Sequence, residues 1–261
     1  MTHKIRQDQQ LGDWKLIKFL GEGGNGSVWF ARNSKEDEAA IKILAKIDGK
    51  SKTKMYYRFK SEVMILQENR DIDGLLPVID FYLPEEFTDD LPWYAMPVAQ
   101  PLDQQLKSAD YEAIIHLILE VGKILTKLHD RGICHRDIKP ANILIWNDRY
   151  CLADFGLVDY PEKQDLTSTG EQIGAKWTMA PEMKRNSNKA DGKPADIYSL
   201  AKMLWILISN RKDGFEGQYI PESVNGLSRL KLTEREEGLG FFSEGPPLIY
   251  TKPLDDLLKA S

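Results

Sequence analysis

Cysteine is scarce in this chain: its 261 residues include two, Cys134 and Cys151. Two cysteines cannot build a disulfide framework, which excludes the class of small disulfide-stapled secreted domains and fits a reducing compartment. Both flank polar motifs, which suggests a redox switch as one hypothesis. The interpretation we favour is that each is a small buried hydrophobic residue.

Long apolar runs and basic runs are also missing. The most apolar stretch, residues 200–208, contains Lys202 and is too short to cross a bilayer, and the polar N-terminus carries no secretory signal. The formal net charge is −5, and no Lys/Arg run interleaved with aromatic residues is present. We therefore expect a soluble cytoplasmic protein without a membrane segment or a nucleic-acid partner.

The hydrophobic periodicity changes along the chain. Residues 14–48 alternate apolar and polar side chains, which predicts an antiparallel sheet with one solvated face, and residues 78–83 and 93–98 read as further strands. Residues 52–69 have helical spacing. After residue 97, the pattern predicts an amphipathic helix at 110–131 and an apolar helix at 196–209. The inward stripe of the amphipathic helix is predicted to hold Ile114, Ile118, Val121, Leu125 and Leu128.

Two short motifs in the second half place acids, a lysine and an amide close together in sequence. The first is His135-Arg136-Asp137, followed by Lys139 and Asn142, and the second begins at Asp154. Phosphoryl transfer from ATP requires an oriented hydroxyl, oxygen ligands for a metal and a cation near the moving phosphate. These motifs offer a candidate for each, although acids that merely cap turns remain the alternative.

A glycine-rich segment precedes them, with Gly21, Gly23 and Gly26 at its turns. Glycines let the backbone approach a triphosphate closely, but a hairpin with nothing bound beneath it explains the pattern equally well on its own. Lys42 follows between Ile41 and Ile43 in a strand-like run. A lysine there must extend outward or meet an anion, because burying it unpaired is expensive.

Taken in order, these motifs and Ala180-Pro181-Glu182 resemble the eukaryotic-type Ser/Thr protein kinase family, and the resemblance runs from Trp14 nearly to the C-terminus. It implies an α+β, two-lobed protein-kinase-like fold, with an antiparallel sheet and one long helix in the N-lobe and a mainly helical C-lobe. We expect an extension at 1–13, the N-lobe at 14–97 and the C-lobe at 98–261. It also implies ATP with Mg²⁺, or Mn²⁺ in its place.

The resemblance assigns a role to each motif residue. It implies that Asp137 orients the substrate hydroxyl or acts as base, that Lys139 neutralises charge on the γ-phosphate, and that Asn142 and Asp154 bind the metal. Lys42 would contact the α- and β-phosphates and pair with a helix glutamate. The implied ATP-binding residues are Gly21, Gly23, Gly26, Val28, Ala40, Lys42, Met96, Val98, Ala99 and Leu144.

Helix phase selects Glu62 as the partner of Lys42, because it stands between the inward-facing Phe59 and Leu66. Glu68 is a poorer choice. The alternative is that Glu62 is an ordinary surface carboxylate.

The resemblance further implies a switch at Arg136, which a phosphate on the activation loop would satisfy. The candidate phosphoacceptors are Thr167, Ser168 and Thr169, although such residues are also ordinary in any polar loop. Asp196 is expected to hold the catalytic loop by hydrogen bonds. The residues implied as structural support are His135, Arg136, Phe155, Gly156, Glu182 and Asp196.

Two features depart from the family pattern. Ala175 stands where family members carry an orienting threonine, unless a slip of one residue brings Thr178 into that role. No later segment supplies the arginine that pairs with Glu182 in the family, so we expect either a C-terminally truncated chain or a lobe that closes differently.

Three functions compete. The first is an ATP-dependent Ser/Thr protein kinase that acts on protein substrates, including its own activation loop through a transient homodimer. The second is a pseudokinase scaffold, favoured by Ala175 and by the short C-terminus. The third is a small-molecule phosphotransferase, which the peptide-docking segment at Glu182 argues against.

Overall fold

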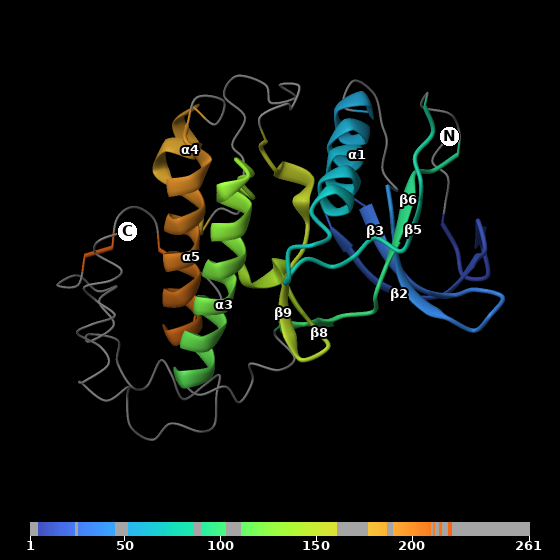
Figure 1. The fold of residues 1–261 in the computed structure, drawn as a ribbon, viewed down its shortest axis with the longest axis horizontal. Helices are drawn as coiled ribbons and strands as arrows, with labels where there is room; N and C mark the ends of the chain where they lie inside the picture. Colours follow the sequence, from blue (N-terminus) through green and yellow to red (C-terminus); the bar gives the residue numbers. More distant parts are fainter. Residues whose placement is uncertain are drawn as a thin grey trace. The chain divides into compact units, whose positions relative to one another are not determined.

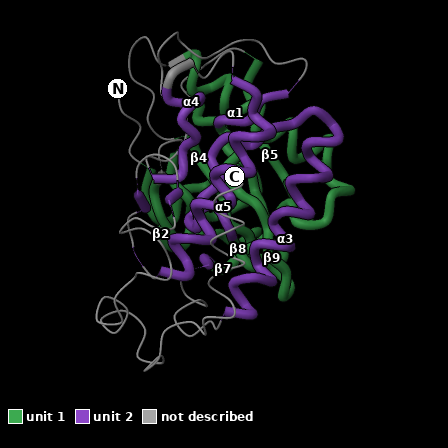
Figure 2. The backbone as a smooth tube through the Cα atoms, turned by 90° about the vertical axis from the view of Figure 1, so that its left-hand side faces the viewer, with its two compact units in different colours: residues 1–100, 144–156 green, residues 101–143, 157–261 purple. Residues whose placement is uncertain are grey.

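The computed structural model describes residues 5–23, 26–44, 52–85, 90–102, 111–160, 177–186, 190–209, 211, 214–215 and 219–220. The chain divides into two compact units (Figures 1 and 2). Unit 1 comprises residues 1–100 and 144–156, and unit 2 comprises residues 101–143 and 157–261. Two separate segments of the chain therefore form unit 1, and the second segment contains Asp154. The lobe boundary between residues 97 and 98 stays a prediction.

Unit 1 is built on a six-stranded antiparallel sheet with the strand order β1-β2-β3-β4-β6-β5. The strands are β1 (Gln10–Leu11), β2 (Trp14–Gly23), β3 (Gly26–Arg32), β4 (Glu38–Ile43), β5 (Asp80–Tyr82) and β6 (Trp93–Met96). The two later strands are shorter than the predicted 78–83 and 93–98. The α+β class, with an antiparallel sheet first and helices after it, is confirmed.

The central strand β4 is buried on both faces, so the predicted solvated face is wrong there. Ala39, Ile41 and Ile43 join an apolar cluster with Trp14 and Trp93 on one side of the sheet. Side chains alternate between faces along a strand, which sends Ala40 and Lys42 to the other side. The helix α1 (Lys52–Glu68) covers that side, with Phe59 packed against Tyr94 at 5.5 Å between ring centroids.

A hairpin outside the six-stranded sheet was not predicted. It joins β8 (Ile143–Trp146) to β9 (Arg149–Leu152), which form a three-stranded sheet with β7 (Gln100–Pro101). Asn147 and Asp148 both have positive φ, of 49° and 58°. Two such residues make the tight turn that suits the twist of a β-hairpin, and Asn-Asp between apolar runs was the signal for it.

Unit 2 is helical in the residues described. The helices α3 (Tyr111–Asp130) and α5 (Gly192–Ser209) lie side by side, and Ile114 packs with Leu204 and Trp205 in one apolar cluster (Figure 1). The buried residues of α3 are Ile114, Leu117, Val121, Ile124, Leu125 and Leu128. Ile118 is only partly buried, because it lies at one edge of the buried face, whereas Leu117 and Ile124 extend that face on its other side.

The helix α5 begins at Gly192, four residues before the predicted start. Pro194 is tolerated in the first turn, where backbone N–H groups have no helical partner, and Asp191 caps this end by accepting a hydrogen bond from the Lys193 N–H at 3.0 Å. Asp196 therefore lies inside the helix and not at its first residue. The short helix α4 (Pro181–Asn186) carries Glu182.

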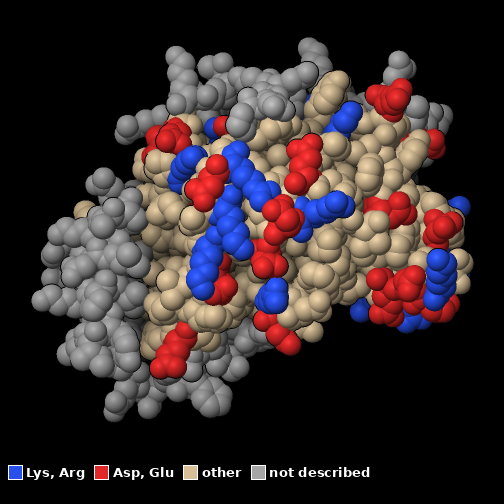
Figure 3. All heavy atoms as spheres, in the orientation of Figure 1, with Lys and Arg blue, Asp and Glu red and all other residues tan. Residues whose placement is uncertain are grey.

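Charges of both signs are interspersed on the face seen in Figure 3. Among the described side chains on that face, neither Lys and Arg nor Asp and Glu form a broad patch free of the other sign. Within the part of the chain that the structure describes, no helix is long and apolar enough to cross a membrane.

Candidate active site

The glycine-rich segment forms the hairpin between β2 and β3. Gly21 pairs with Val28, and Gly23 pairs with Gly26 as the last rung before the turn. Gly26 has a φ of +141°, and a Cβ there would lie 2.1 Å from the carbonyl oxygen of Ile43. Only glycine fits this position, because any side chain would collide with the backbone of β4.

Lys42 lies at the centre of a buried ion cluster in unit 1. Its Nζ is 2.7 Å and 2.8 Å from the two carboxylate oxygens of Glu62, and 3.1 Å from Oδ1 of Asp154. Glu62 is fully buried, so it is not the surface carboxylate of the alternative interpretation. The pair that helix phase indicated is present. Among the described contacts, the cluster joins one cation to two carboxylates.

The pKa values in this cluster follow from burial and charge. Burial disfavours the charged form of Lys42, but attraction to Glu62, with Tyr94 and Asp154 adding less, raises the pKa of Lys42 well above its ordinary value. Burial raises the pKa of Glu62, while Lys42 acts in the opposite direction. The two short N–O distances show that the lysine and the carboxylate form an ion pair.

Tyr94 is a member of this cluster that the sequence did not reveal. Its hydroxyl donates a hydrogen bond to Oε1 of Glu62 at 3.0 Å. It lies directly across from Lys42 in the pairing of β4 with β6. Cross-strand register brings the two together, and no local sequence pattern specifies that register.

The residues implied to surround the adenine all lie in unit 1. Ala40 is buried and pairs across the sheet with Met96, while Val98 is exposed. The remaining members, Val28, Ala99 and Leu144, are half-buried. Their role in binding ATP stays a prediction.

The His-Arg-Asp motif in unit 2 is organised around Asp137. Its Oδ2 accepts hydrogen bonds from Lys139 Nζ at 2.7 Å and from Asn142 Nδ2 at 3.0 Å, and Asn142 also donates to the Asp137 carbonyl at 2.7 Å. Oδ1 is buried and has no hydrogen-bond partner among the residues that the structure describes. A buried acceptor left open in this way needs an explanation, and a substrate donor is one.

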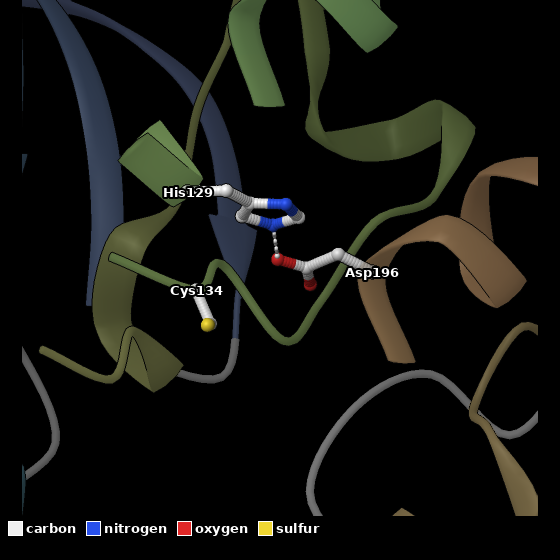
Figure 4. A group of neighbouring side chains, drawn as sticks. All are labelled: His129, Cys134 and Asp196. Carbon is white, nitrogen blue, oxygen red and sulfur yellow. Dashed lines mark hydrogen bonds and ion pairs between the residues drawn. The ribbon is translucent and has the colours of Figure 1, made fainter. Parts of the chain in front are cut away.

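Asp196 supports this loop from α5, as the resemblance implied. Its Oδ1 accepts a hydrogen bond from the Arg136 N–H at 2.7 Å, and its Oδ2 accepts one from the His135 N–H at 2.8 Å. His129 Nε2 also lies 2.9 Å from Oδ2 and donates to it, since a carboxylate offers only acceptors (Figure 4). His129 was missed because it sits at the end of an amphipathic helix without a motif of its own.

Cys134 stands beside this pair (Figure 4), and its sulfur lies within 4.8 Å of the ligand atoms of His129 and Asp196. Three donors already occupy the carboxylate, and burial raises the pKa of Cys134 to about 11, so the thiol stays protonated near neutral pH. Cys151 is also buried, and burial raises its pKa to about 11. These properties support the interpretation of both cysteines as packing residues and weigh against a metal or redox site.

Arg136, the predicted switch, is paired within its own unit. Its side chain is 5% exposed, and its guanidinium forms an ion pair with Asp159. Two backbone hydrogen bonds between Cys134 and Asp159, each 2.8 Å, hold the carboxylate in place. A phosphate that reached Arg136 would have to share or displace this carboxylate. Asp159 was missed because nothing in the sequence near it marks a partner.

Several predicted residues lie outside those that the structure describes. These are the phosphoacceptor candidates Thr167, Ser168 and Thr169, together with Ala175. Phe155 and Gly156 are buried at the start of a 3₁₀ turn (Phe155–Leu157), and Asp154 just before it has a left-handed φ of 63°. Glu182 is exposed.

Residues 14–228 match the family described as the protein kinase domain, which covers most of this chain. The chain therefore belongs to the protein kinase domain family. The match begins at the predicted residue and ends before the predicted extent near the C-terminus.

Named bacterial kinases are among its relatives. It is 26% identical over 230 residues to the serine/threonine-protein kinase AfsK of Streptomyces coelicolor, which covers 85% of this chain and 27% of AfsK. It is 29% identical over 216 residues to the serine/threonine-protein kinase PknE of Mycobacterium bovis, and the match covers 78% of this chain and 36% of PknE. It is 30% identical over 221 residues to the serine/threonine-protein kinase PknJ of the same species, and the match covers 80% of this chain and 36% of PknJ. The chain thus spans roughly a third of each relative.

Proposed function

We propose that this chain is an ATP-dependent Ser/Thr protein kinase that transfers the γ-phosphate of ATP to hydroxyl groups of proteins. The observation that carries the proposal is the open Oδ1 of Asp137. Lys139 and Asn142 fix the other oxygen of this carboxylate, so Oδ1 faces a predetermined direction as an acceptor without a donor among the described residues. A substrate hydroxyl supplies the missing donor and is oriented for attack as it binds.

Lys139 has a second task in this proposal. Its Nζ is already 2.7 Å from Asp137, and its side chain is 30% exposed, so it can shift toward charge that develops on the transferred phosphate. The stabilisation is specific to the transition state if the contact with phosphate forms only then. Asp137 and Lys139 thus bring a proton acceptor and a cation to the same reacting group.

The oxygen donors of Asn142 and of Asp154 are each of the kind that a divalent metal prefers. The amide nitrogen of Asn142 makes both of its hydrogen bonds to Asp137, which leaves the amide oxygen as the atom that a cation can use. Asp154 contributes a carboxylate that is one-third exposed. Hard oxygen ligands of this kind suit Mg²⁺, with Mn²⁺ as a substitute, and the metal would neutralise phosphate charge. Asn142 and Asp154 are the residues that we propose hold it.

Lys42 and Glu62 form the nucleotide-binding part of the proposal. The buried ion pair places a lysine at a fixed point on β4, two residues after Ala40 and across from Val28. We propose that it contacts the α- and β-phosphates beneath the hairpin of Gly21, Gly23 and Gly26. The adenine would contact Val28, Ala40, Met96, Val98, Ala99 and Leu144, as the family resemblance implies.

We further propose that the kinase phosphorylates its own chain at Thr167, Ser168 or Thr169 through a transient homodimer, and that it works in the cytoplasm. The scarcity of cysteine supports a reducing compartment. Membership of the kinase family supports proteins as the substrates.

The test is phosphate incorporation measured by mass spectrometry after incubation with MgATP and a mixture of Ser- and Thr-containing peptides. The parent protein should transfer phosphate to peptide hydroxyls and to residues 167–169. Asp137→Asn should lose at least about a hundredfold in rate, the low end of what one general acid–base group contributes. Asp148→Asn is the matched control: it changes an exposed acid in the β8–β9 turn and should leave the rate unchanged.

Two outcomes would contradict the proposal. If the parent binds ATP but transfers no phosphate, the chain is a nucleotide-binding scaffold. If it phosphorylates an aminoglycoside or a choline-like acceptor and no peptide, it is a small-molecule phosphotransferase. Equal transfer by the parent and by Asp137→Asn would show that Asp137 does not orient the hydroxyl.

A further inference from the structure

Tyr94 brings a buried hydroxyl to the ion pair of unit 1. Its side chain is 2% exposed, and its place across from Lys42 in the β4–β6 pairing puts both side chains on the same face of the sheet. The hydroxyl donates to Oε1 of Glu62 at 3.0 Å. The ring packs against Phe59 of α1, so the phenol contacts the helix through both its ring and its hydroxyl.

The hydrogen bonds around Lys42 leave none of its donors uncommitted. A lysine ammonium has three N–H groups, and Lys42 has three carboxylate oxygens within reach, two on Glu62 and one on Asp154. A contact between Lys42 and a phosphate must therefore replace one of these bonds. When the bond that is replaced is the one to Oε1 of Glu62, the hydroxyl of Tyr94 is the remaining donor to that oxygen among the described residues.

We propose that Tyr94 is a positioning residue for phosphoryl transfer: its hydroxyl holds Glu62 in place, so that the ion pair with Glu62 keeps Lys42 positioned for the phosphates of the nucleotide. This inference rests on the proposed kinase function. It adds a residue of β6 to the site, and no sequence motif includes that residue.

The physical reason is that Glu62 has no access to water. A fully buried carboxylate oxygen that loses its donor cannot recruit solvent and is costly to leave unsatisfied. Without the hydroxyl, Glu62 would turn, or α1 would move, to find another donor, and the ion pair that places Lys42 would be disturbed. Either response lowers the fraction of molecules in which Lys42 can bind phosphate.

Tyr94 also remains a donor throughout the working pH range. Burial, reinforced by the negative charge of Glu62, raises the pKa of Tyr94 well above its ordinary value, so the phenol stays protonated. Replacement by phenylalanine removes the hydroxyl and keeps the ring that packs on Phe59.

The experiment compares Tyr94→Phe with the parent in peptide phosphorylation and in MgATP binding. We expect kcat/KM for ATP to fall about tenfold and the Kd for MgATP to rise by a similar factor, with KM for the peptide unchanged. The matched control is Tyr56→Phe. Tyr56 is a buried tyrosine of α1 whose hydroxyl donates to the carbonyl of Pro84, away from the ion pair, so this variant should keep the parent's kcat/KM for ATP.

A double-mutant cycle with Glu62→Ala separates positioning from general destabilisation. Once the carboxylate is gone, removing the Tyr94 hydroxyl should cost no further activity or MgATP affinity. If Tyr94→Phe loses the same factor in both backgrounds, or if Tyr56→Phe loses as much, the inference is wrong.

The proposed function can fail separately. A parent that binds MgATP without transferring phosphate overturns the function, and the ratio of Kd values between Tyr94→Phe and the parent still decides the role of Tyr94. A parent that transfers phosphate at the same efficiency as Tyr94→Phe overturns this inference and leaves the function standing.

Discussion

Replacing Asp196 by asparagine should loosen the catalytic loop by an amount that the hydrogen bonds predict. The carboxylate accepts from the N–H groups of Arg136 and His135, at 2.7 Å and 2.8 Å, and from His129 at 2.9 Å. Asparagine keeps the shape but offers one acceptor oxygen, and its NH₂ group must face at least one of these donors. In either amide orientation, a buried donor loses its partner.

The expected cost is about 2–4 kcal/mol in the free energy of unfolding. A buried donor without an acceptor costs about 1–3 kcal/mol, and the bonds that remain weaken by about 1 kcal/mol because their acceptor is no longer charged. Domains of this size are stable by about 5–15 kcal/mol, so Asp196→Asn should still fold. Its kcat should fall, since the backbone beside Asp137 is no longer held.

The assay is urea unfolding followed by tryptophan fluorescence, together with kcat under conditions where both proteins are folded. Asp191→Asn is the matched control, five residues earlier at the start of the same helix. Its exposed carboxylate caps the helix through one oxygen, and asparagine caps about as well, so the change should stay within about 0.5 kcal/mol. Equal losses in the two variants would refute the account of Asp196.

Three further predictions concern the hairpin, the thiols and the buried arginine. Gly26→Ala should lower stability by about 1–3 kcal/mol through backbone strain and collision with the Ile43 carbonyl. Gly21→Ala, whose Cβ would meet nothing within 4 Å, should change stability little, and equal losses of stability would contradict this. Burial raises the pKa of Cys134 and Cys151 from 9.0 to about 11, so alkylation of both thiols at pH 8 should be slow until urea unfolds the protein. The stability that these protonated thiols contribute should be full below pH 9 and decline toward pH 11. Rapid alkylation of the folded protein would disprove the burial of the thiols. In Asp159→Asn, the buried guanidinium of Arg136 loses its carboxylate partner, and a phosphate on the chain itself must neutralise it. Peptide phosphorylation by this variant should therefore depend more strongly on preincubation with MgATP, which adds that phosphate. An unchanged time course would argue against a role for the Arg136–Asp159 pair.

Helix phase was sufficient to select the buried glutamate. Glu62 stands between two inward-facing apolar residues of a long amphipathic pattern, and helical periodicity alone puts it on the face toward the sheet. Glu68, one turn and a half further on, is exposed. The same periodicity misjudged Ile118 on α3, because the sequence does not say which part of the helix surface its neighbours will cover.

The motif residues were likewise readable as chemistry before any fold was known. Asp137, Lys139 and Asn142 are separated by so few residues that one loop brings them together, and the structure joins them by hydrogen bonds of 2.7–3.0 Å. Local chain geometry suffices for such contacts, because the chain between them is short.

The sequence by itself determined which chemical groups occur and on which kind of element each lies. These groups are a glycine hairpin, a lysine on a strand, a glutamate on a helix, and a loop that carries an acid, a lysine and an amide. Local spacing along the chain specifies each of them. Only the tertiary structure decided which distant side chains complete these groups. Tyr94 meets Glu62 through the register of β4 with β6, and Asp159 meets Arg136 through a bridge to Cys134. Register and bridging depend on how whole elements pack, and a shift of one residue would turn each of these side chains to the opposite face.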